Sequence, residues 1–309
     1  MIELVKRLGP IVKTQSLRDN VNGPSVIRVP NWVENKLGKY YMYFAHHLGK
    51  YIRLAYSDKI EGPWKIYEPG TLRLDQTLCV DHIASPDVHV DNDRIIMYFH
   101  GKTIGLGQVT YVADSFDGLN FNYRPVATDP FDNDSTEIYK GDTPISSFYF
   151  RRFMIDDNYY GLSKKGNEGL QLLQWDGVSP YNPYLVKKRL ILLGRHCTVH
   201  VSDKFVYVIY SAIGDCPERI VYNVYTRNFD IVSINHSLIR PEELYEGVNQ
   251  PYIQSRPGST LTNGINQLYA QLRDPYLFED DGKMYLFYSI AGENGIAVAE
   301  IKINEKELE

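Results

Sequence analysis

A plan that recurs five times along the chain constrains its fold more than any other feature. In each repeat a polar opening leads into two apolar, aromatic-rich segments and then a third, and the third repeat is the least regular. The openings fall at residues 22–27, 85–90, 147–150, 195–200 and 273–278. Repeats of roughly 50 to 80 residues built from short strands are typical of β-propellers. We therefore expect an all-β fold, a five-bladed β-propeller.

Turn-forming residues separate the first and second strands of four repeats. They lie at 91–93, 156–158, 202–204 and 280–282, and such polar clusters between apolar segments indicate hairpins. The predicted organisation is one propeller domain over residues 1–309, with blades at about 20–75, 80–130, 140–190, 191–240 and 268–305. This spacing leaves room for a fourth, outer strand in each blade. A β-sandwich whose segments resemble each other by chance is the alternative.

The composition limits the partners and the compartment. Hydrophobic residues make up 43% of the chain, enough for a packed core, and its 25 tyrosines suit both strands and stacking on sugar rings. A net charge of −5 argues against nucleic acid, because no basic stripe could neutralise phosphates. No apolar run suits a signal peptide or a membrane span. Cys79, Cys197 and Cys216 lack metal-ligand spacing and are expected to be reduced thiols. We expect a cytoplasmic protein that binds neither nucleic acid nor membrane.

The polar openings of the repeats are expected to converge. In a propeller the innermost strands run side by side around one axis, so that their first residues meet at one mouth. A ring of charged groups there is costly unless it is hydrated or binds a ligand. The mouth is therefore the predicted functional site. The residues brought to it are Asn22, Asp87, the Ser146–Ser147 region, Arg195, His196, Arg273 and Asp274.

Two of these openings resemble a known superfamily. The motifs Ser85-Pro86-Asp87-Val88 and Arg273-Asp274-Pro275-Tyr276 are similar to those of the five-bladed glycosidases of glycoside hydrolase families 43, 32, 68 and 117, over about residues 20–301. The resemblance implies carboxylates at the mouth that act as base or nucleophile, as general acid and as a positioning group. Asp87 matches the second-blade aspartate, and Asp274 resembles the arginine-aspartate-proline aspartate of family 32.

The chain departs from family 43 at two of its three standard positions. Where that family has a base aspartate in the first blade, this chain has Asn22, which cannot take a proton at neutral pH. Where the family has a glutamate acid in the third blade, this chain has Ser146-Ser147-Phe148. Either the acid–base pair lies elsewhere, or the chemistry of the family is lost.

Four carboxylates are candidates for a relocated catalytic pair. Asp87 and Asp274 open strands, although each could simply cap backbone amides. Glu246 lies in the long insert before the fifth repeat, where burial could raise its pKa, or where it could be merely solvated. Glu218 follows a middle strand and could instead pair with its neighbour Arg219.

Histidines and arginines around the mouth are the candidate substrate-binding groups. Guanidinium groups suit carboxylates and phosphates, although one or two could instead tie blades together. Related propellers carry an axial histidine, the place of His196, that holds a water or calcium. No metal or other cofactor is expected to be required, and a calcium ion at the axis stays open. The substrate-binding candidates are Asn22, His46, Arg53, His82, His100, Arg195, His196 and Arg273.

The predicted function is cleavage of a glycosidic bond in a small saccharide, neutral or anionic. Asp87 and Asp274 are expected to act as base and positioning carboxylate, with Glu246 or Glu218 as the acid. Phosphorolysis like that of family 130, or transglycosylation, is the alternative at the same mouth. The alternative from another functional class is a non-catalytic, sugar-binding propeller. It is suggested by Asn22 and by the missing third-blade glutamate.

Overall fold

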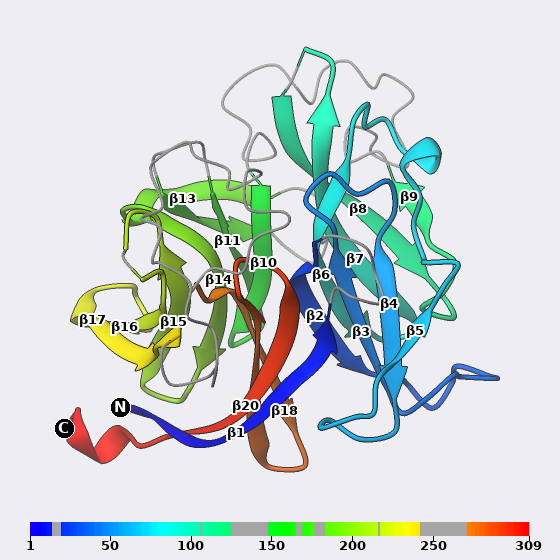
Figure 1. Cartoon of the computed structure of the whole chain (residues 1–309). Helices are drawn as coiled ribbons and strands as arrows, with labels where there is room; N and C mark the ends of the chain where they lie inside the picture. The colour runs from blue at the N-terminus through cyan, green and yellow to red at the C-terminus, as the bar shows by residue number, and fades with distance from the viewer. Residues whose placement is uncertain are drawn as a thin grey trace.

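The chain forms five four-stranded antiparallel sheets arranged as the blades of a propeller, seen in a computed structural model (Figure 1). This confirms the predicted fold class in place of the sandwich. The structure describes residues 1–13, 20–105, 107–124, 148–164, 169–175, 183–215, 217–241 and 271–308. None of the helices in these ranges has the length and apolar character needed to cross a membrane.

Each blade is a meander whose first strand lies nearest the axis. The first two blades contain β2 (Asn22–Arg28), β3 (Tyr40–Ala45), β4 (Arg53–Ser57) and β5 (Lys65–Tyr67), then β6 (Ile83–Asp91), β7 (Arg94–Thr103), β8 (Gly107–Ser115) and β9 (Asn122–Arg124). The next two contain β10 (Phe148–Ile155), β11 (Asn158–Lys164), β12 (Leu170–Trp175) and β13 (Pro183–Ile191), then β14 (Gly194–Val201), β15 (Phe205–Ala212), β16 (Ile220–Thr226) and β17 (Ile231–Ile239). The fifth contains β18 (Arg273–Asp280), β19 (Lys283–Ile290), β20 (Gly295–Ile303) and β1 (Ile2–Lys13). Two 3₁₀ turns, Leu74–Gln76 and Glu305–Glu307, complete the described elements.

The ring is closed by the N-terminal strand. β1 pairs with β20 from Ile2 opposite Ile303 to Lys13 opposite Gly295, and Figure 1 shows the two strands side by side. The fifth blade therefore combines the two ends of the chain. The sequence repeat at 268–305 contains only three of the four strands of this blade. The fourth strand, β1, comes from the N-terminal segment, which lies outside the repeats.

The middle strands are apolar throughout because both of their faces are buried. In β3, Tyr41 and Tyr43 pack toward blade two, whereas Met42 and Phe44 pack toward blade five. Successive side chains of a strand point to opposite faces, so each alternation serves a different interblade core. This is why the run of residues 40–45 contains no polar side chain that faces solvent.

The first strand of every blade begins with the same β-bulge. Between two consecutive pairs, three steps along the inner strand match two steps along its neighbour, as between Asn22 opposite Ala45 and Ser25 opposite Tyr43. The corresponding shifts start at Ala84, Phe148, Gly194 and Arg273. The residue after the first pair has a positive φ in four blades, at Gly23, Ser85, Tyr149 and Asp274. A bulge bends the strand and redirects side chains, so this shared device shapes the propeller mouth.

Candidate functional site

A cavity of about 360 Å³ opens at the mouth where the inner strands begin. We call it the mouth cavity. Most of its lining residues are polar, and they include four histidines and an arginine. The lining residues are Asn22, His47, Leu48, Asp81, His82, Ala84, Ser85, His100, Lys102, Gly107, Gln108, Tyr149, Arg195, His196, Asp274 and Glu293.

The shared bulge decides which residues reach this cavity. Its second position is occupied by Gly23, Ser85, Tyr149, Arg195 and Asp274 in blade order, and the last four of these line the mouth cavity. None of the residues at the fourth position, two residues later, lines the cavity. One extra residue per strand thus places a set of unlike side chains from four blades around one space.

Asp87 occupies the fourth position of its bulge and does not line the mouth cavity. Its carboxylate accepts hydrogen bonds from the Arg152 amide at 2.7 Å and from His89 Nε2 at 2.8 Å, and it lies 3.4 Å from Arg151 Nη1. It is buried, and although burial raises its pKa, its cationic neighbours leave that pKa below the ordinary value. The bulge therefore corrects the expected placement: Ser85, not Asp87, is the blade-two counterpart of Asp274.

Asp274 lines the cavity and is held by three neighbours. Its Oδ2 accepts hydrogen bonds from Ser289 Oγ at 2.9 Å and from the Gly23 amide at 3.3 Å, while Oδ1 contacts His196 Nδ1. The other ring nitrogen, His196 Nε2, lies 2.9 Å from Ser85 Oγ. Burial raises the pKa of Asp274, but His196 outweighs it, and the carboxylate stays ionised with a lowered pKa.

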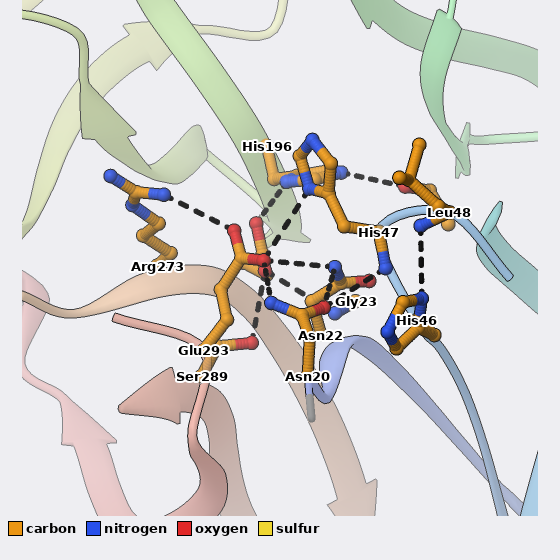
Figure 2. Close-up of polar contacts among 12 residues, drawn as sticks. Asn20, Asn22, Gly23, His46, His47, Leu48, His196, Arg273, Ser289 and Glu293 are labelled. Atoms are coloured by element: carbon orange, nitrogen blue, oxygen red, sulfur yellow. Dashed lines mark hydrogen bonds and ion pairs between the residues drawn. The ribbon is translucent and has the colours of Figure 1, made fainter. Parts of the chain in front are cut away.

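Glu293, on the β19–β20 loop, is the second carboxylate of the cavity wall (Figure 2). Its Oε2 accepts hydrogen bonds from Asn20 Nδ2 at 2.7 Å and Asn22 Nδ2 at 3.0 Å, and lies 3.5 Å from His47 Nδ1. Its Oε1 accepts one from Arg273 Nη1 at 3.2 Å. Although burial raises its pKa, these donors hold it well below the ordinary value, so Glu293 is ionised.

A buried cluster of one glutamate and two arginines adjoins the cavity wall. Glu218 is fully buried and lies 3.0 Å from Arg195 Nε and 2.7 Å from Arg273 Nε, so both arginines share it. Neither Glu218 nor Arg273 lines the cavity, so the structure places the predicted acid and the predicted substrate-binding arginine outside its lining. Arg195 does line it, and its buried Nη2 has no hydrogen-bond partner among the described residues.

The other predicted residues divide between the cavity and the surrounding structure. Asn22, His82 and His100 line the cavity. His46 is outside it and accepts a hydrogen bond from the Leu48 amide, and Arg53 is buried and donates to the Asn20 carbonyl oxygen at 2.9 Å. Glu246, Ser146, Ser147 and Cys216 lie outside the described residues.

The pKa values of two histidines on the cavity wall are shifted in opposite directions. Burial lowers the pKa of His196, and its contact with Asp274 does not reverse this, so the imidazole is neutral at pH 7. Burial also acts to lower the pKa of His47, but Glu293 outweighs it and raises that pKa above the ordinary value. Groups whose pKa values are pushed apart in one site are natural acid and base partners.

The described residues do not fit an axial calcium ion. Calcium prefers oxygen ligands, and the axial His196 uses both of its ring nitrogens on Asp274 and Ser85. Among the residues that the structure describes, no group of three or more His, Cys, Asp or Glu side chains is arranged to hold a metal. We therefore derive no chemistry through calcium.

Sequence reasoning missed Glu293, Ser85 and His47 as site residues. Glu293 follows a middle strand in the loop Ala291-Gly292-Glu293, which carries no proline or other opening signal. In blade two the sequence analysis favoured Asp87 over Ser85. The pairing of His47 with Glu293 joins distant parts of the chain, so it could not be predicted from local sequence. Both Ser85 and Glu293 have a positive φ, which cannot be read from the sequence.

Comparison with known proteins places this chain beside a viral protein. The uncharacterized protein R118 of Acanthamoeba polyphaga mimivirus is 33% identical over 319 aligned positions, which cover 91% of this chain and 83% of that protein. No protein-family model matches the chain.

Solved structures share the fold at low identity. A glycosyl hydrolase from Bacteroides ovatus superposes with a TM-score of 0.67 at 10% identity, covering 97% of this chain and 93% of the other. CoXyl43, a family 43 β-xylosidase/α-arabinofuranosidase from a compost microbial metagenome, gives 0.61 at 14%, covering 98% and 96%. A family 43 subfamily 1 enzyme from Xanthomonas citri gives 0.59 at 11%, covering 97% and 90%. The superposed structures are five-bladed glycoside hydrolases, as the sequence resemblance predicted.

Proposed function

Because this chain belongs to the same family as mimivirus protein R118 and has the five-bladed fold of family 43 glycoside hydrolases, we propose that it hydrolyses a glycosidic bond in a small saccharide. The observation that carries the proposal is a pair of histidines on the wall of one cavity, each against its own carboxylate. The cavity volume of about 360 Å³ suits one or two sugar rings.

His47 is the proposed general acid. Its ion pair with Glu293 stabilises the imidazolium, which can donate a proton to the glycosidic oxygen as the bond to the anomeric carbon breaks. The carboxylate of Glu293 keeps its negative charge, so it supports the proton donor instead of serving as one. This replaces the third-blade glutamate of family 43 with a histidine–glutamate pair from blades one and five.

His196, oriented by Asp274, is the proposed general base. When the attacking water takes the place of the Ser85 hydroxyl at Nε2, the neutral imidazole accepts a proton from that water, and the ionised Asp274 stabilises the imidazolium that forms. The products are a hemiacetal and an alcohol. Asp274 thus keeps a part in the reaction, as the sequence predicted, but through the ring of His196.

Arg195 is the proposed anchor for the saccharide. Its Nη2 is a buried donor without a partner among the residues described, which suits a sugar carboxylate or a phosphate. This favours an anionic saccharide. The same donor would hold inorganic phosphate if phosphate replaced water as the attacking group.

The test is turnover of a panel of aryl glycosides and small oligosaccharides, with and without phosphate. We expect His47→Gln and Asp274→Asn each to lower kcat by about 100-fold or more. Asp93→Asn, on the exposed β6–β7 turn, is the matched control and should leave kcat unchanged. Sugar binding without turnover in either buffer would contradict the proposal and favour a non-catalytic binding propeller. Turnover only with phosphate would instead identify a phosphorylase.

A further inference from the structure

We propose that Ser85, His196 and Asp274 form a nucleophilic serine relay that gives the mouth cavity a second activity, the hydrolysis of carboxylic esters such as an O-acyl group on a sugar. The proposal goes beyond glycoside hydrolysis, because it concerns a different bond and a residue with no part in that reaction. It stands on the geometry of three side chains from blades two, four and five.

The three side chains form one continuous chain of polar contacts. Ser85 Oγ lies 2.9 Å from His196 Nε2, and His196 Nδ1 contacts Asp274 Oδ1. This is the order hydroxyl, imidazole, carboxylate that activates a serine in hydrolases of unrelated folds. Such relays are recognised by geometry and not by sequence order, and here the order along the chain is serine, histidine, aspartate.

The surroundings fix the tautomer that the relay requires. Asp274 is fully buried and is held at its other oxygen by Ser289 and the Gly23 amide, so Oδ1 is directed at the imidazole. An ionised carboxylate against Nδ1 requires the proton on that nitrogen. Nε2 therefore presents its lone pair to the Ser85 hydroxyl. The ring of Tyr149, with its centroid 3.6 Å from that of His196, restricts rotation of the imidazole.

Ser85 is placed as a nucleophile and not as an ordinary strand residue. Its φ of +51° belongs to the left-handed region, which serine seldom adopts, and the bulge directs it to the cavity wall. Residues held in this region cluster at functional sites, and nucleophilic serines often lie on such sharp turns. The missing side chain of Gly23 makes room, because a Cβ there would lie 3.3 Å from Ser85 Cα.

The reaction balances with the ester and water as its only reactants. Ser85 Oγ bonds to the carbonyl carbon while its proton passes to His196 Nε2. The ester C–O bond then breaks, and the alcohol leaves with that proton, which gives an acyl-Ser85 intermediate. Water attacks the acyl carbon, loses a proton to Nε2, and that proton returns to Ser85 Oγ as the carboxylic acid departs.

Arg195 supplies the charge that this reaction needs. A tetrahedral intermediate carries a negative oxygen, and a preorganised donor beside it lowers the barrier. Arg195 occupies the same bulge position in its blade as Ser85 and Tyr149 do in theirs, and it lines the same cavity; its Nη2 has no hydrogen-bond partner in the described part of the chain. The side chain is only 6% exposed, so water screens its charge little.

The simplest test is covalent labelling of the full chain with a fluorophosphonate, read by intact mass and peptide mapping. We expect one phosphonyl group per chain on Ser85, none on Ser85→Ala, and labelling at least 100-fold slower for His196→Gln. Ser57→Ala is the matched control, since Ser57 is similarly buried (5% against 4% exposed) and does not line the mouth cavity. It should label like the wild type.

The decisive measurement is the labelling of the wild-type protein, so the test remains valid even if a variant fails to fold. No adduct on wild-type Ser85, or an adduct on another residue, would overturn the proposal, as would equal labelling of folded His196→Gln. Hydrolysis of p-nitrophenyl acetate and of an acetylated methyl glycoside should follow the same order of variants. Loss of glycosidase activity would not affect this reading, since the adduct forms without a glycoside.

Discussion

At the scale of single residues, the proton chemistry that we propose for the mouth uses imidazoles and not carboxyl groups. Asp274 and Glu293 each accept several hydrogen bonds from buried donors, and both have lowered pKa values. Glycosidases usually need one carboxyl group whose pKa is raised. Neither of these two carboxylates meets that need, whereas the pKa of His47 is raised and that of His196 is lowered.

A pH profile tests this assignment. Activity requires neutral His196 and protonated His47, so kcat/KM should rise as pH passes the lowered pKa of His196 and fall as pH passes the raised pKa of His47. The maximum should lie around the ordinary imidazole value of about 6.5. His47→Gln should lower the rate and remove the alkaline limb, while His200→Gln, which pairs with Glu279 away from the cavity, should keep both limbs. An alkaline limb that persists in His47→Gln would refute the assignment.

At the scale of elements, the bulge that opens each inner strand determines the site. The sequence correctly placed Asp274, Arg195 and His196 at the mouth, because they open strands next to the axis. It could not distinguish the second from the fourth position of a bulge, since an extra residue leaves no trace in a pattern of apolar and polar residues. This ambiguity is why the sequence analysis matched Asp87, and not Ser85, with Asp274.

Gly23→Ala tests the bulge directly. Gly23 has a φ of +59°, and an added Cβ would lie 3.3 Å from Ser85 Cα. Gly9 has a φ of +88° with no atom within 4 Å of such a Cβ, so Gly9→Ala carries backbone strain without the contact. Backbone strain should cost each variant about 1–2 kcal/mol in urea unfolding, and Gly23→Ala should lose more. Its labelling of Ser85 should also slow. Equal unfolding free energies and equal labelling rates would show that the contact is unimportant.

At the scale of the whole molecule, the fold could be predicted because every blade repeats the same burial. Middle strands such as β3 and β15 supply alternate residues to two different interblade cores, which gives the continuous aromatic runs seen five times. The closing strand could not be predicted in this way. β1 pairs with a strand almost 300 residues away, and it mixes polar and apolar residues without the continuous aromatic run of a middle strand. Only the tertiary structure joins it to blade five.

Closure by β1 should stabilise both the ring and the β19–β20 loop that carries Glu293. Val12 is 5% exposed, lies opposite Ile296 and packs in the core between blades five and one, whereas Val5 on the same strand is 50% exposed. Val12→Asp buries an unpaired carboxylate and should cost about 3 kcal/mol or more, while Val5→Asp should change stability by less than about 0.5 kcal/mol. Urea unfolding measures both.

The same change should reach the mouth cavity. Lys13 pairs with Gly295, and the Val21 amide donates to the Glu293 carbonyl oxygen at 2.8 Å, so the chain on both sides of residues 14–19 is tied to the loop that carries Glu293. Loosening β1 should therefore displace the carboxylate that keeps His47 protonated, and lower kcat under conditions where the protein stays folded. If Val12→Asp were no more destabilising than Val5→Asp, pairing with β1 would not be what holds the ring closed. If stability fell while kcat in the folded protein did not, closure and catalysis would be independent properties of this propeller.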